Sequence, residues 1–218
     1  MPQKVLLPSD EPTPGVEWIP PGPIPTTLRE FGKFPNIEHW LPADLLLVSS
    51  LTPDATTRQI INAQERGGYG SEDARWQHAA VYIGEGYVVE ATLHGVRYAP
   101  IYAYLGSHRL RVRRPSGISN DDRWRIAIQA SVRSNERYAF QSILGLFALS
   151  FVGFWKPRRG FQIAEAKSVI CSQLYADSYS RVTGKLVTQP LAGKITPAAL
   201  SSSAALDDVD LAWAKIPS

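Results

Sequence analysis

The sequence predicts an α+β fold in which an antiparallel sheet packs against helices, and two observations favour this class. Two β-rich runs, residues 78–83 and 87–92, are separated by a Gly-Glu-Gly connector (84–86), which is typical of a β-hairpin. Residues 54–66 and 121–134 instead have helical composition and acidic residues at their starts. Because 218 residues suffice for one domain with a sizeable core, we expect a single domain with extensions.

The first element along the chain is a proline-rich arm. Eight of the 17 prolines lie in the first 25 residues, where fixed φ angles and missing N–H donors disfavour helices and central strands. We therefore expect residues 1–35 to form an extended arm that Trp18 and Ile19 could anchor to the domain surface, with a disordered tail as the alternative. The domain itself is expected over residues 36–218.

The next elements follow from periodicity and from capping residues. A short apolar run in residues 41–50 predicts a buried strand, and Asp54 is a good cap for the helix that follows. Residues 108–115 alternate apolar and arginine side chains, which predicts a strand with one face in solvent. Thr196 and Pro197 predict the start of a short helix near the C-terminus.

Residues 139–155 form a run of 17 residues without a charge, and a basic and aromatic border follows it. A membrane-spanning helix needs about 20 apolar residues, so we expect a buried or partly interfacial helix, while a transmembrane span stays open. Contact with an anionic membrane surface through residues 139–161 is a second possibility, with a solvated loop at the border as its alternative. We treat residues 139–163 as an apolar insertion in the domain.

Composition and charge argue against several classes of protein. Hydrophobic residues make up 44% and charged residues 20%, as in soluble folded proteins, which disfavours a disordered chain and a membrane bundle. The net charge of +3 is too small to predict nucleic-acid binding. The N-terminal segment lacks the apolar core of a Sec signal peptide, so we expect a cytoplasmic protein, with non-Sec export left open.

The chain has one cysteine, Cys171, which excludes an internal disulfide and a multi-thiolate zinc site. It is therefore either a buried apolar residue or a reactive thiol. The helical pattern after it predicts that Cys171 lies at or near a helix N-terminus. Unpaired N–H groups and the helix dipole favour a thiolate at such a position and can also hold an oxyanion.

A reactive thiol needs a base, and His78 is the strongest candidate among the four histidines. It opens an apolar strand, where an imidazole is costly unless it is hydrogen-bonded or used. We expect His39 and His108 at the surface and His94 at a turn. A three-residue hairpin loop would place Glu90 on the same face as His78, diagonally across the strands, where it can orient the imidazole. A two-residue loop would turn Glu90 away.

Five sequence blocks carry a resemblance to a known family. The blocks are PADLLLV (42–48), WQHAAVYIGEGYVVEA (76–91), RYAF (137–140), ICSQLY (170–175) and ITPAALSSS (195–203). Their order along the chain resembles that of the circularly permuted NlpC-type amidases of the papain-like superfamily, the YiiX and YaeF group, whose relatives include lecithin:retinol acyltransferase. In that family the histidine hairpin precedes the cysteine helix, as it does here, and the likeness covers residues 41 to about 205.

The resemblance implies a permuted papain-like fold and a role for each matched residue. Cys171 matches the nucleophile, His78 the base and Glu90 the acidic partner, while Tyr138 either assists oxyanion binding or packs as an aromatic residue. The implied reaction is hydrolysis of an amide bond in a cell-wall or other short peptide, through a thioester and without a metal or organic cofactor. A hydrolase or acyltransferase acting on lipid amides or esters is the first alternative, and a non-catalytic binding module is the second.

Overall fold

The computed structural model describes residues 4–20, 22–92, 95–133, 159–191 and 194–217, with the backbone alone for residues 159–170. It is a mixed helix and sheet protein whose paired strands are antiparallel. The main sheet has, in spatial order, strands β5 (Gly95–Pro100), β4 (Tyr87–Thr92), β3 (His78–Gly84), β2 (Leu45–Ser50), β6 (His108–Pro115) and β7 (Leu206–Asp208). A second sheet pairs β1 (Lys33–Pro35) with β8 (Trp213–Lys215).

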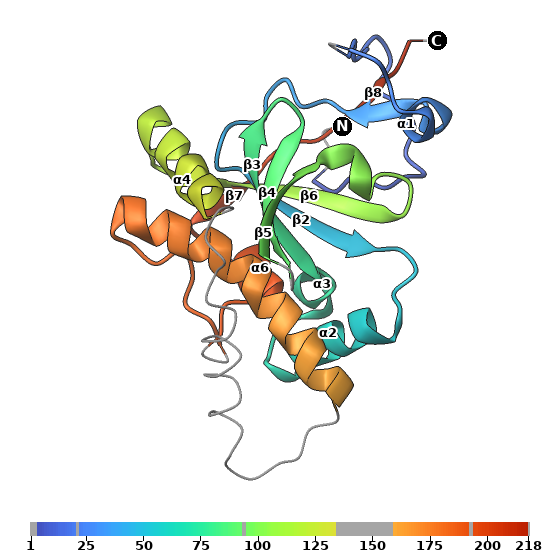
Figure 1. The fold of residues 1–218 in the computed structure, drawn as a ribbon. Helices are drawn as coiled ribbons and strands as arrows, with labels where there is room; N and C mark the ends of the chain where they lie inside the picture. The colour runs from blue at the N-terminus through green and yellow to red at the C-terminus, as the bar shows by residue number, and fades with distance from the viewer. Residues whose placement is uncertain (1–3, 21, 93–94, 134–158, 192–193, 218) are drawn as a thin grey trace, which may run out of the picture.

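Helices cover one face of the main sheet, and the terminal segments cover the other. Figure 1 shows the long helix α6 (Arg159–Thr183) running across the sheet with α4 (Asn120–Val132) beside it. The helix α1 (Thr26–Phe31) lies beside β8, away from α6. The remaining helices are α2 (Ala55–Arg66), α3 (Ser71–Ala74), the 3₁₀ helix η1 (Ile101–Tyr104) and α7 (Pro197–Ser201).

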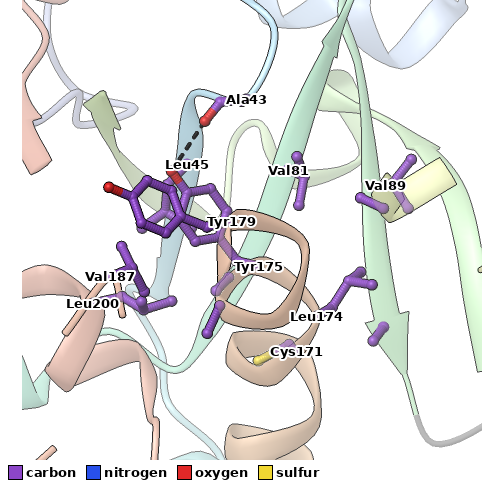
Figure 2. Packing of buried hydrophobic residues seen from close by; sticks show 14 of the residues in the cluster. Ala43, Leu45, Val81, Val89, Cys171, Leu174, Tyr175, Tyr179, Val187 and Leu200 are labelled. Atoms are coloured by element: carbon purple, nitrogen blue, oxygen red, sulfur yellow. Dashed lines mark hydrogen bonds between the residues drawn. The ribbon is translucent and has the colours of Figure 1, made fainter. Parts of the chain in front are cut away.

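The central part of α6 is fixed by the apolar core beneath it. Figure 2 shows Cys171, Leu174 and Tyr175 on neighbouring turns of this helix, with Leu174 directed toward Val89 on the sheet. The Tyr175 hydroxyl donates a hydrogen bond of 3.1 Å to the Ala43 carbonyl oxygen, as the dashed line in Figure 2 marks. A buried hydroxyl that finds a partner avoids a desolvation penalty, so this bond helps to fix the helix on the strands.

The capping residues place two predicted helices where the sequence indicated. The Asp54 side chain accepts a hydrogen bond from the Thr57 amide at 2.7 Å and begins α2. The Thr196 hydroxyl accepts from the Ala199 amide at 3.2 Å and begins α7, with Pro197 at its first position. Both predicted helix starts are confirmed.

The N-terminal arm is attached to the domain by side chains that the sequence only partly indicates. Trp18 stacks on Phe34 with 4.1 Å between ring centroids, whereas Ile19 is 77% exposed and anchors nothing. Leu6, which gave no sequence signal, is fully buried and pairs with Leu110 on β6. The expectation of an extended chain was wrong for Thr26–Phe31, because a helical turn follows Pro25 and ends at Gly32 in a left-handed conformation.

The arginine side of β6 was expected in solvent, and this expectation was wrong. Arg111 forms an ion pair with Asp208 on β7 at 2.7 Å. Arg113 is almost completely buried and donates hydrogen bonds to the backbone carbonyls of Ser201, Ser203 and Leu206. The strand β7 and the end of α7 therefore cover this side of the sheet, and arginine satisfies their carbonyl groups.

Replacing Arg113 by methionine should destabilise the protein. The substitution keeps the aliphatic stem but leaves three buried carbonyl oxygens without their donor. We expect the free energy of unfolding, measured in urea, to fall by about 3 kcal/mol. The matched variant Arg29→Met removes an exposed arginine and should change it little. Equal stability of the two variants would contradict this role of Arg113.

The expected insertion at 139–163 and its contact with a membrane surface lie largely outside the described residues. Among the helices that the structure does describe, none is both long enough and apolar enough to cross a bilayer.

Candidate active site

The β3–β4 hairpin brings His78 and Glu90 to one face of the sheet through a turn and a bulge that the sequence did not predict. Gly84 pairs with Tyr87, so the turn has two residues, Glu85 and Gly86, which both have positive φ angles. A register shift between Tyr82 and Gly84 inserts one unpaired residue.

A two-residue turn alone would place the side chains of His78 and Glu90 on opposite faces of the sheet. The extra residue of the bulge shifts β3 by one position, so that they lie on the same face. Val81 lies opposite Val89, and continuing that register places His78 two positions from the residue that faces Glu90. The two side chains therefore share a face, as expected for a three-residue loop.

The Glu90 carboxylate is buried and fixed by several hydrogen bonds. It is 2% exposed and accepts hydrogen bonds from three donors. His78 Nε2 and the Tyr104 hydroxyl, the latter at 2.5 Å, contact Oε2, while Arg97 Nε donates to Oε1 at 2.7 Å. A buried carboxylate with this set of partners is oriented and charged, so it can fix the imidazole and stabilise imidazolium.

The thiol of Cys171 completes the group through a hydrogen bond with His78. Since His78 Nε2 contacts Glu90, Nδ1 is the ring nitrogen left for the sulfur. The structure thus brings Cys171, His78 and Glu90 into one chain of contacts, although 93 residues separate the first two in sequence.

The position of Cys171 within its helix differs from the expectation. The helix begins at Arg159, so Cys171 lies near its middle and not at its N-terminus. The reason is local: residues 161–170 contain good helix formers and neither glycine nor proline, so nothing ends the helix before the cysteine. The dipole effect is confined to the first turn, and hence His78 is the main source of positive charge near the sulfur.

The pKa values of the pair follow from these contacts. Burial lowers the pKa of His78, but the hydrogen bond to Cys171, the charge on that sulfur and the contact with Glu90 outweigh it and raise the pKa to about 10. Burial raises the pKa of Glu90, whereas its bonds from His78, Tyr104 and Arg97 lower it to about 2. At neutral pH the carboxylate is therefore charged and the imidazole is protonated.

A pocket of about 440 Å³ adjoins His78. Its lining includes His78, Glu90, Arg97, Tyr104 and His108, together with Asp54, Thr56, Thr57 and Ile60 from α2 and its cap. Cys171 is 1% exposed and is not among the lining residues, so His78 lies between the pocket and the thiol in the chain of contacts.

Three residues of the site carried no clear sequence signal. His108 was expected at the surface, yet it opens β6 on the face of Leu110 and is half-buried in the pocket. Arg97 and Tyr104 contact Glu90 only because β5 pairs with β4 and η1 folds back over it. Strand alternation could have indicated His108, whereas the other two depend on tertiary structure. His39 is exposed as expected, and Tyr138 and His94 lie outside the described residues.

Replacing Glu90 by glutamine should remove a pH-dependent part of the stability. The pKa of Glu90 is lower in the folded protein than the ordinary value of 4.5, so its stabilisation is present above pH 4.5 and is lost as the pH falls toward 2. This loss amounts to about 3 kcal/mol. Urea unfolding between pH 2 and 5 should show it in the wild type and not in Glu90→Gln.

The control for this experiment is Glu85→Gln, in the turn of the same hairpin. Glu85 is exposed and should leave the pH dependence intact. A Glu90→Gln protein that still loses stability over the same pH range would show that other carboxylates are responsible.

Comparison with protein-family models and with curated proteins finds no match to this chain. Within the described part of the chain, no group of three or more His, Cys, Asp or Glu side chains is placed to hold a metal ion.

Proposed function

We propose that this protein is a cysteine hydrolase that cleaves an amide bond in a short peptide through a thioester acyl-enzyme. The observation that carries the proposal is the contact chain from the Cys171 thiol through the His78 imidazole to the buried Glu90 carboxylate. Nucleophile, base and orienting acid in hydrogen-bond contact are the minimal set for this chemistry.

The reaction uses these three side chains in turn. With His78 protonated, the Cys171 thiolate attacks the carbonyl carbon and forms a tetrahedral intermediate. His78 then gives its proton to the leaving amine as the C–N bond breaks, which leaves a thioester on Cys171. Neutral His78 next takes a proton from water, the hydroxide oxygen bonds to the thioester carbon, and the thiolate leaves. Glu90 keeps its charge throughout and stabilises the imidazolium.

The fold is compatible with a permuted papain-like arrangement. A histidine hairpin comes first in the chain, a cysteine helix comes later, and the helix packs on the antiparallel sheet that holds the hairpin. Together with the sequence resemblance, this arrangement supports an NlpC-type hydrolase and a cell-wall or related short peptide as the substrate.

The buried sulfur adds a requirement to the mechanism. Cys171 is 1% exposed, so a carbonyl bound in the pocket reaches the sulfur only after His78 or the neighbouring turn of α6 moves. We infer that substrate binding causes this movement and gives the carbonyl access to the sulfur. In other enzymes, too, the catalytic geometry is complete only in the complex with substrate.

A lipid acyl hydrolase is the second candidate, and one surface feature favours it. Trp124, Ile128 and Val132 lie four residues apart on α4, and each is more than half exposed. Such a stripe of large apolar side chains suits contact with a lipid surface. The uncharged residues 139–155 follow closely in the sequence.

Parallel incubations distinguish the two substrates. The protein is mixed with peptidoglycan fragments in one series and with phospholipid vesicles in the other, and released amine or fatty acid is measured. We expect product from the peptide series alone, and none from Cys171→Ala in either series. Product from vesicles alone would favour the lipid hydrolase, and an absence of Cys171-dependent product in both would favour a binding module.

A further inference from the structure

His108 lines the pocket beside His78, and the proposed mechanism does not use its imidazole. Its Nδ1 lies 3.2 Å from the Tyr104 carbonyl oxygen and 2.9 Å from the Ser107 hydroxyl. A carbonyl oxygen can only accept a hydrogen bond, so Nδ1 carries the proton and Nε2 presents a lone pair. Among the described residues, Nε2 has no protein partner, and the residue lines the pocket beside His78.

The ring is also fixed in place. It packs edge-on against Tyr104 with centroids 6.1 Å apart, and the hydroxyl of the same tyrosine is bonded to Glu90. The pocket therefore offers a substrate a rigid hydrogen-bond acceptor, held on the same scaffold as the catalytic carboxylate. A fixed acceptor discriminates strongly, because a substrate without a donor leaves it desolvated and unpaired.

We infer that His108 Nε2 accepts a hydrogen bond from an N–H group of the substrate, which makes the site selective for peptide-like acyl groups over acyl esters that lack this donor. This inference rests on the proposed cysteine hydrolase activity and names the substrate class of the same site. His108 is a binding residue, so its loss should raise KM and leave kcat nearly unchanged.

Protonation of His108 should remove the selectivity. Burial lowers the pKa of His108, the Tyr104 carbonyl opposes this, and the positive charge of His78 lowers it further. The ring is therefore neutral at pH 7, and Nε2 changes from acceptor to donor only as the pH falls below the ordinary value of 6.5. The titratable or charged side chains that line the pocket with it are His78, Glu90, Arg97, Tyr104 and Asp54.

Two matched ester probes test the inference. N-acetyl-L-alanine p-nitrophenyl ester carries an amide N–H, and O-acetyl-L-lactic acid p-nitrophenyl ester has an oxygen in the same position and an identical scissile bond. We expect wild-type KM to be about tenfold lower for the amide-bearing probe, with this preference lost in His108→Leu and restored in His108→Gln, whose amide oxygen can accept. The wild-type preference should fade at low pH, and the glutamine variant should keep it.

The results separate this inference from the proposed function. Cys171-dependent cleavage of both probes with equal KM, or an unchanged preference in His108→Leu, would overturn the role of His108 and leave the hydrolase in place. Cleavage that persists in Cys171→Ala, or no cleavage of either probe by the wild type, would overturn the hydrolase and this inference with it.

Discussion

Replacing Cys171 by alanine should abolish hydrolysis while leaving the protein folded. The substitution removes one sulfur atom from the core and the only thiol of the chain, so the chemical step loses its nucleophile. We expect kcat/KM for N-acetyl-L-alanine p-nitrophenyl ester to fall by about 10⁴-fold or more, as when a triad member is removed from other hydrolases. The measurement is p-nitrophenol release, with circular dichroism as the check on folding.

The matched control for this experiment is Ser178→Ala on the same helix. Ser178 is buried, and its hydroxyl donates to the Leu174 carbonyl oxygen at 2.8 Å, so the variant also deletes one buried polar atom of α6. It should retain the activity. Wild-type activity in Cys171→Ala would show that Cys171 is not the nucleophile.

Replacing His78 by glutamine should have the second-largest effect. The variant keeps a hydrogen-bonding group toward Glu90 but loses the cation beside the sulfur and the proton donor for the leaving group. We expect hydrolysis to fall by about 10³-fold, within the range of a lost general acid and base. Alkylation of Cys171 by iodoacetamide at pH 6.5 should slow by about tenfold.

The alkylation measurement distinguishes loss of charge from loss of access. The pKa of His78 is raised to about 10, so the wild-type imidazole keeps its positive charge between pH 6.5 and 9. Over this range the alkylation rate should therefore be higher in the wild type than in His78→Gln. His39→Gln, an exposed histidine with the same substitution, should behave as the wild type.

The sequence places His78 and Glu90 on one face of the sheet only if the hairpin loop has three residues. In the structure they share a face although the turn has two residues. The Gly-Glu-Gly connector predicts a hairpin, and the structure has one. The turn has two residues and a bulge in β3 precedes it, so two deviations from the expected loop cancel in their effect on strand parity. The position of a bulge depends on how both strands pack against the rest of the domain. The sequence of the hairpin alone therefore does not predict it.

The surroundings of Cys171 were harder to predict. The pattern after the cysteine indicates a helix, but the residues before it are also good helix formers, and the helix extends back to Arg159. Burial of the thiol depends on the strands beneath α6, which are distant in the sequence. The same holds for Arg113, whose buried carbonyl partners belong to a segment about 90 residues later.

Capture of the acyl-enzyme tests the pairing of Cys171 with His78 most directly. Wild-type protein is mixed with N-acetyl-L-alanine p-nitrophenyl ester, quenched in acid within seconds and examined by intact-mass spectrometry and peptide mapping. We expect one N-acetylalanyl group, bound as a thioester to Cys171 and reduced to a trace in His78→Gln. Folded wild-type protein that stays unmodified while it cleaves the ester, or carries the acyl group on another residue, would contradict thiol catalysis at this site.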